Sequence, residues 1–173
     1  NLKVLVAAHC LFDAPNGYGD NLFPDFYDWL TFLKKASLET PYDWYLKTHP
    51  DFLPGNEEKI IEIISGGNIT LIPSSTSHHQ LISEGIDVAL TVYGTIGSEY
   101  AALGRTVVNA SLTNPHISYD FNINPSTVEE YKSIIFNLEN HLMQPNRDKV
   151  LEYYSIKLYT YTGRWFFPRW DDV

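Results

Sequence analysis

The sequence has little of what several common classes of protein need. It contains one cysteine, Cys10, so no disulfide can form within the chain. Its 12 basic residues are outnumbered by 21 acidic ones, and a net charge of −9 argues against a nucleic-acid surface or an anionic membrane surface. The longest mainly apolar runs, 4–8 and 86–92, are far shorter than the ~20 residues of a membrane helix. No basic start leads into an apolar signal segment. We therefore expect a cytoplasmic protein with no transmembrane segment and no nucleic-acid partner.

Several motifs of nucleotide, hydrolase and metal chemistry are also missing. The sequence has no G-x-x-x-x-G-K-[ST] phosphate loop, no G-x-G-x-x-G after the first apolar run, no G-x-S-x-G elbow and no D-x-D pair. The adjacent His78 and His79 would point about 100° apart on a helix, which does not suit one metal ion. We expect neither a metal nor a bound cofactor.

What the sequence does contain is enough apolar material for the core of one domain. Hydrophobic residues make up 44% of the 173 residues, and aromatic residues make up 14%. Short apolar runs of the kind found in strands buried on both faces alternate with helix-period segments. This alternation predicts an α/β fold, a doubly wound, Rossmann-like parallel sheet of about five strands. The expected strands are 2–8, 43–48, 69–72, 86–92 and 106–110.

The expected helix ends follow from capping residues. Asn56 is predicted to cap the helix that precedes the third strand. Ser126 and Glu129 fit a capping box, and the apolar spacing after them predicts one long helix that reaches Leu142. A further helix is expected from about Arg147. The domain should therefore carry extra helices after its sheet.

The carboxyl ends of the strands are where an open parallel sheet binds ligands. The second strand ends in Lys47, Thr48, His49 and Pro50. This places an ammonium and an imidazole at the sheet edge, where they could hold a phosphate. The alternative is that His49 only bonds a neighbouring backbone group.

The fourth strand leads into a glycine-rich and hydroxyl-rich helix start. Gly94, Thr95, Gly97 and Ser98 would let backbone N–H groups approach an anion, which the helix dipole also favours. Glu99 could accept hydroxyl groups of a ribose, or it could only stabilise the first helical turn. The sequence thus indicates a phosphate-binding turn here, with a capping role as the alternative.

Two other strand ends carry weaker candidates. Ser74 lies in a hydroxyl-rich segment after the third strand, where it could contact a ligand or belong to a helix cap. His9 and Asp13 follow the first strand and could supply an acid or a base. Ordinary turn chemistry explains the nearby Asn16-Gly17 pair equally well.

Together these segments resemble a family that none of them indicates singly. The chain resembles the carboxyl-terminal, donor-binding domain of bacterial capsular and surface-polysaccharide glycosyltransferases of the GT-B architecture. The resemblance covers residues 2 to about 124. It is carried by the segments 4–9, 12–15, 23–30, 42–50 and 93–104.

The resemblance implies a function for several of these residues. In related transferases that use cytidine-nucleotide donors, a lysine/histidine–proline motif and a serine/threonine motif hold the donor phosphate. Here His49 with Pro50 matches the first motif, and Thr95 with Ser98 matches the second. His49 would then be the catalytic residue that stabilises or protonates the departing nucleotide. The implied donor is a CMP-linked or CDP-linked sugar, used without a metal.

The resemblance also implies that residues 1–173 form one half of a GT-B fold. The acceptor polysaccharide and its general base would then belong to a missing amino-terminal domain, and the full-length protein could join a peripheral membrane complex. We expect the aromatic segment 153–170 to contact that missing half. The isolated domain should bind a nucleotide but transfer no sugar.

Two other functions fit the same sequence. A GT-B-fold epimerase would share the nucleotide-sugar site and differ in its acid and base residues. A flavodoxin-like binding domain would have no transfer activity. Asp13 and Asp20 are seven residues apart, which does not match the adjacent acidic pair of a phospho-acceptor site.

Overall fold

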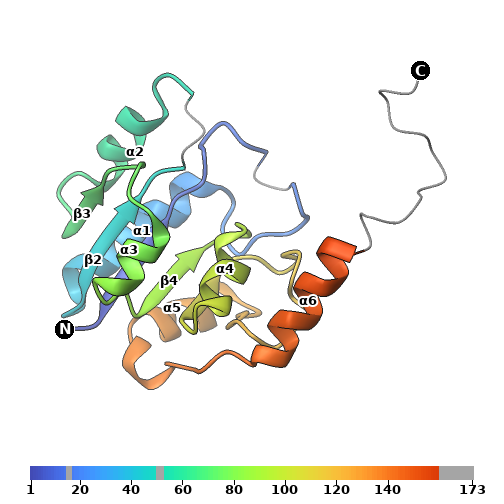
Figure 1. The fold of residues 1–173 in the computed structure, drawn as a ribbon. Helices are drawn as coiled ribbons and strands as arrows, with labels where there is room; N and C mark the ends of the chain where they lie inside the picture. The colour runs from blue at the N-terminus through green and yellow to red at the C-terminus, as the bar shows by residue number, and fades with distance from the viewer. Residues whose placement is uncertain (15–16, 50–52, 160–173) are drawn as a thin grey trace, which may run out of the picture.

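A five-stranded parallel sheet forms the centre of the molecule (Figure 1). The computed structural model describes residues 1–14, 17–49 and 53–159. The strand order is β3-β2-β1-β4-β5, and every neighbouring pair is parallel. The strands are β1 (Lys3–Ala7), β2 (Asp43–Lys47), β3 (Ile69–Ile72), β4 (Val88–Thr91) and β5 (Thr106–Asn109). The predicted α/β, doubly wound fold with five strands is confirmed.

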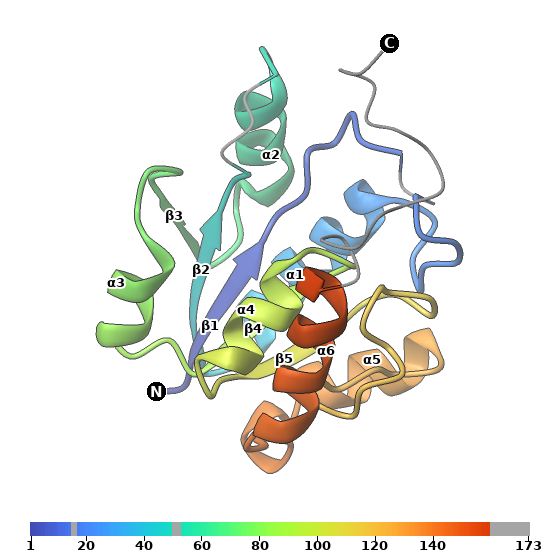
Figure 2. The ribbon, with the colours of Figure 1, turned by 45° about the vertical axis from the view of Figure 1, so that its right-hand side comes forward.

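Helices cover both faces of this sheet. They are α1 (Phe26–Glu39), α2 (Asn56–Ile64), α3 (His78–Ser83), α4 (Ile96–Ala102), α5 (Val128–Ile135) and α6 (Arg147–Tyr159). The apolar residues of α1, α2 and α5 pack in one core cluster, and those of α3 and α4 pack in a second cluster on the opposite face. Helix α6 lies against the outside of α4, as Figure 2 shows.

Alternation along β1 explains why Val4, Leu5 and Val6 are all apolar. Val4 and Val6 belong to the cluster under α1, whereas Leu5 belongs to the cluster under α4. All three side chains are fully buried. The middle of a strand between two helical layers has no solvent face, so each of these three side chains gains about 2 kcal/mol from burial.

Two of the predicted caps are wrong by one residue. Gly55, not Asn56, is the N-cap of α2, and the Asn56 side-chain oxygen instead accepts the Leu11 N–H at 2.8 Å. Thr127, not Ser126, is the N-cap of α5, where it accepts the Glu130 N–H at 3.1 Å. A long-range contact engages Asn56, and the Glu130 carboxylate four residues away engages Ser126.

The predicted long helix that reaches Leu142 is also wrong. Helix α5 ends at Ile135, and a short 3-10 helix, η1, covers Leu138–Asn140. Asn137 leaves the helical conformation and donates its side-chain amide to the Ser133 carbonyl at 2.9 Å. This bond satisfies a carbonyl at the helix end, so the chain can turn there.

The helix expected from about residue 147 is confirmed as α6. Of the aromatic segment 153–170 that we expect to contact a missing half, Tyr153 is instead buried against Phe121 of this domain, and Trp165, Phe166 and Trp170 lie outside the described residues. Within the described part of the chain, no helix combines the length and apolar character that crossing a membrane requires.

Candidate functional site

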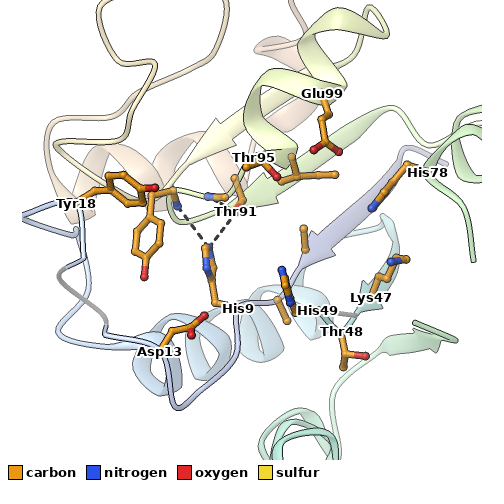
Figure 3. Close-up of a pocket in the computed structure, with 15 residues that line it drawn as sticks. His9, Asp13, Tyr18, Lys47, Thr48, His49, His78, Thr91, Thr95 and Glu99 are labelled. Atoms are coloured by element: carbon orange, nitrogen blue, oxygen red, sulfur yellow. Dashed lines mark hydrogen bonds between the residues drawn. The ribbon is translucent and has the colours of Figure 1, made fainter. Parts of the chain in front are cut away.

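One cavity of about 440 Å³ opens at the carboxyl ends of β1, β2 and β4. The connections leave β1 and β4 in opposite directions, so this is the point of an open sheet where ligands bind. The pocket is lined by Ala7, Ala8, His9, Asp13, Tyr18, Lys47, Thr48, His49, His78, Thr91, Tyr93, Gly94, Thr95, Ile96 and Glu99 (Figure 3).

Strand β2 brings two basic side chains to the pocket. Lys47, its last residue, is only 6% exposed, and burial lowers the pKa of its ammonium group while the Glu99 carboxylate opposes that shift. His49 follows two residues later and is exposed. Thr48 lies between them, with its hydroxyl 3.4 Å from the Glu57 carboxylate of α2. The ammonium of Lys47 is thus poorly solvated, and an anion in the pocket would stabilise it.

A third basic side chain comes from the start of α3. Ser77 caps this helix by accepting the Gln80 N–H, and the helix begins at His78. One ring nitrogen of His78 lies 3.1 Å from the Tyr100 hydroxyl. Burial lowers the pKa of His78, and Lys47 lowers it further. Among the described residues, no group of three histidine, cysteine or acidic side chains is arranged to hold a metal ion.

The turn between β4 and α4 presents hydrogen-bond donors to the same cavity. Thr95 is exposed and makes no capping bond with its side chain. Within the described part of the chain, no hydrogen bond engages the backbone N–H groups of Thr95 and Ile96. At Gly94 a side chain would meet the Thr91 hydroxyl at 2.8 Å, so the turn requires glycine there. Thr95 and Ile96 both line the pocket at the start of α4, so their backbone N–H groups are candidate donors to a ligand.

His9 holds this turn in place. Its Nε2 atom lies 3.1 Å from the Thr91 hydroxyl and accepts the N–H groups of Val92 at 3.3 Å and Tyr93 at 3.4 Å. An imidazole that accepts backbone N–H groups on Nε2 is neutral and carries its proton on Nδ1. Burial, reinforced by His49, lowers its pKa to about 4. The His9 ring also stacks on Phe26, with ring centroids 4.7 Å apart. His9 is therefore a positioning residue with its Nε2 already occupied.

The structure brings together most of the candidates named from the sequence. The pocket contains His9, Asp13, Lys47, His49, Gly94, Thr95 and Glu99. Ser74 is a half-buried residue of the turn after β3 and does not line it. Pro50 lies outside the described residues.

Gly97 and Ser98 also lie outside the pocket lining. Ser98 is buried, donates its hydroxyl to the Thr95 carbonyl at 3.0 Å and accepts the Tyr154 hydroxyl of α6 at 3.2 Å. A side chain at Gly97 would meet the His116 ring at 2.5 Å. Both residues therefore lie on the side of α4 that packs against the rest of the protein. The prediction that Gly97 and Ser98 contact the ligand is therefore wrong for this pocket. The sequence does not fix how a helix is rotated about its axis, so it could not show which residues of the first turn face the cavity.

Sequence reasoning missed five polar or aromatic residues of the pocket. They are Tyr18, Thr48, His78, Thr91 and Tyr93. All except Tyr18 lie within a few residues of a strand end or at a helix start, so a search restricted to those positions could have found them. Tyr18 lies ten or more residues beyond β1, and only the tertiary structure returns it to the pocket.

The chain matches none of the models of known protein families, and no curated protein matches it either. The resemblance to capsule-type transferases therefore stays a prediction.

Proposed function

We propose that this chain is the donor-binding domain of a metal-independent glycosyltransferase of capsular or surface-polysaccharide biosynthesis. One observation supports the proposal above all: a single cavity is lined by Lys47, His49, Thr95 and Glu99. This cavity lies between β1 and β4, where the strand order of the sheet reverses. Cationic groups, free backbone donors and a carboxylate are the groups that a nucleotide sugar needs around its phosphate and hydroxyl groups.

In this proposal the donor phosphate lies between strand β2 and the start of α4. The N–H groups of Thr95 and Ile96 and the Thr95 hydroxyl donate to its oxygens, and Lys47 balances its charge. These groups are held by the fold before the ligand arrives, so they need little rearrangement as negative charge grows on the leaving nucleotide. His49 donates a hydrogen bond or a proton to that leaving group.

The remaining groups have separate tasks. Glu99 accepts hydroxyl groups of the ribose or of the donor sugar. His9 keeps the β4–α4 turn in shape and stays neutral through the physiological pH range, because its pKa is about 4. The acceptor and its base come from outside this chain, so the isolated domain is expected to bind without transferring sugar.

A binding experiment on Lys47 tests the proposal. Calorimetry with CMP, CDP, UDP and GDP should find one nucleotide that binds, and Lys47→Met should weaken that binding by about tenfold or more, the scale of a charge-assisted hydrogen bond. The melting temperature of Lys47→Met should not fall, because methionine removes a desolvated charge. Lys35→Met on the exposed surface of α1 is the matched control and should change neither quantity.

Two outcomes would contradict the proposal. One is that no nucleotide binds at millimolar concentration. The other is that Lys47→Met binds the nucleotide as tightly as the wild-type protein does.

A further inference from the structure

We propose that Tyr18 and Tyr93 form an aromatic wall on which the nucleobase of the ligand stacks. This inference rests on the proposed function and deepens it, since it names the part of the ligand that the second end of the pocket takes. Both tyrosines line the cavity, and neither is among the phosphate-binding candidates.

The two rings lie against each other at the pocket. Their centroids are 5.2 Å apart at an interplanar angle of 60°. Tyr93 also contacts the His9 ring, with centroids 4.6 Å apart. The rings of Tyr18, Tyr93 and His9 therefore form one cluster at the pocket, in which His9 is buried and Tyr18 is exposed.

Tyr93 is the fixed part of this wall. Its hydroxyl donates to the Ala14 carbonyl at 2.8 Å, and its backbone N–H donates to His9. Burial raises the pKa of its hydroxyl, which keeps it protonated and able to donate. Tyr18 contacts this fixed ring at a tilt, lines the cavity and remains 56% exposed, so much of its side chain is accessible to a ligand. A second flat ring can extend the contact without displacing a protein group.

The pocket has two ends of different chemistry. Figure 3 shows Tyr18 and Asp13 at one side of the cavity, and Lys47, His78 and Glu99 at the other, with Thr95 and His49 between them. A phosphate is suited to the middle of the cavity, where Lys47 can balance its charge, whereas the Glu99 carboxylate suits hydroxyl groups. The tyrosine side offers apolar ring faces, which suit a flat, uncharged group. A nucleoside phosphate has both parts in one molecule, whereas a sugar phosphate lacks the flat ring.

The test compares ligands that differ in the base alone. Calorimetry measures the affinities of ribose 5-phosphate and of CMP, UMP, GMP and AMP for the wild-type protein and for Tyr18→Ala. Base stacking on an aromatic side chain is worth about 1–3 kcal/mol, so Tyr18→Ala should weaken the tightest nucleotide by roughly fivefold or more. It should leave ribose 5-phosphate unchanged. Tyr18→Phe, which keeps the ring, should bind like the wild-type protein.

A matched control and a spectroscopic readout separate stacking from general damage. Tyr27 is 52% exposed on α1 and does not line the pocket, so Tyr27→Ala should have no effect on either ligand. Saturation-transfer NMR should show base protons closer to the protein than ribose protons, and Tyr18→Ala should reverse that order.

Each outcome has one meaning. If the wild-type protein binds a nucleotide and Tyr18→Ala binds it equally well, the aromatic wall is wrong and the phosphate site stands. If ribose 5-phosphate and the nucleotide bind the wild-type protein with equal affinity, the base makes no contact and the wall is again wrong. If neither ligand binds, the proposed function fails and the wall fails with it.

Discussion

Two clusters of polar side chains lie at the carboxyl edge of the same sheet, and only one of them is a pocket. The first is the cavity at β1, β2 and β4. The second lies at the end of β5, and we call it the asparagine cluster. It consists of Asn109, Asn114, His116, Asn122 and Asn124. Both clusters combine a histidine with hydrogen-bonding neighbours at the place where Rossmann-like sheets bind ligands.

The asparagine cluster is largely closed to solvent, whereas the pocket is open to it. Asn109 is fully buried and His116 is nearly so, with the His116 ring stacked on Phe121 and packed edge-on against Tyr153 of α6. The side-chain oxygens of Asn109 and Asn122 have no hydrogen-bond partner within the described part of the chain. In the pocket, by contrast, His49, Thr95 and Tyr18 are exposed.

A lowered histidine pKa does not separate the two clusters. Burial lowers the pKa of His9 and that of His116 to about 4 alike. What separates them is whether a ligand can reach the donors. A perturbed histidine at a strand end is therefore evidence for a site only when accessible groups accompany it.

The largest predicted effect is on turnover, and it concerns His49 of the open pocket. A large loss would support the view that the pocket, and not the asparagine cluster, is the functional site. In a transfer reaction that supplies the acceptor-binding partner of the proposed function, His49→Ala should lower turnover by about 10²-fold or more, because it removes a positioned acid or charge stabiliser. Steady-state kinetics measures the loss. His79→Ala is the control, since His79 is exposed and does not line the pocket. Near-normal turnover with a lowered melting temperature would make His49 a structural residue.

The contact between α4 and the asparagine cluster should be the next most sensitive point. Gly97→Ala places a methyl group 2.5 Å from Nε2 of His116, so it should cost about 1–3 kcal/mol of unfolding free energy. Urea denaturation measures this cost. The double variant Gly97→Ala/His116→Ala should lose less than the sum of the two single changes. Additive losses would show that the two residues do not clash.

Stability should fall as the pH drops, because both buried histidines resist protonation. Their pKa is about 4 in the folded protein and 6.5 in the unfolded chain, so between these values the unfolded state binds more protons. From pH 7.5 to pH 5 each histidine should remove about 2 kcal/mol of unfolding free energy. His116→Gln should flatten this dependence by about half. An unchanged pH dependence would place the effect elsewhere.

The smallest predicted effect distinguishes the hydroxyl group of Thr95, which lines the pocket, from that of Ser98, which is buried. Thr95→Val should weaken nucleotide binding by about two- to tenfold, the scale of one lost hydrogen bond. Ser98→Ala should leave binding unchanged and lower stability, because the Ser98 hydroxyl bonds Tyr154 and the Thr95 carbonyl. Calorimetry and thermal denaturation distinguish the two. Weaker binding by Ser98→Ala alone would show that Ser98 reaches the ligand.

The sheet could be predicted because burial on both faces leaves a local signal. Residues 4–8 and 88–90 are apolar without interruption, and they make up most of strands β1 and β4. The helix ends were less predictable. Asn56 and Ser126 are good capping residues in isolation, yet Asn56 bonds Leu11 and Ser126 bonds the Glu130 carboxylate. The Asn56–Leu11 contact joins residues 45 positions apart and has no signature in the local sequence, whereas Ser126 and Thr127 are adjacent alternatives that the local pattern does not distinguish.

The sequence by itself determined the fold class and the sheet edge at which to look for chemistry. Strand periodicity and alternation with helices are local properties, and the direction of parallel strands follows from them. Only the tertiary structure decided which polar groups share the pocket. The rotation of α4 about its axis places Thr95 and Glu99 at the pocket and buries Ser98 against α6. That rotation is set by the packing of α4 between the sheet and α6, which depends on contacts between residues far apart in the chain.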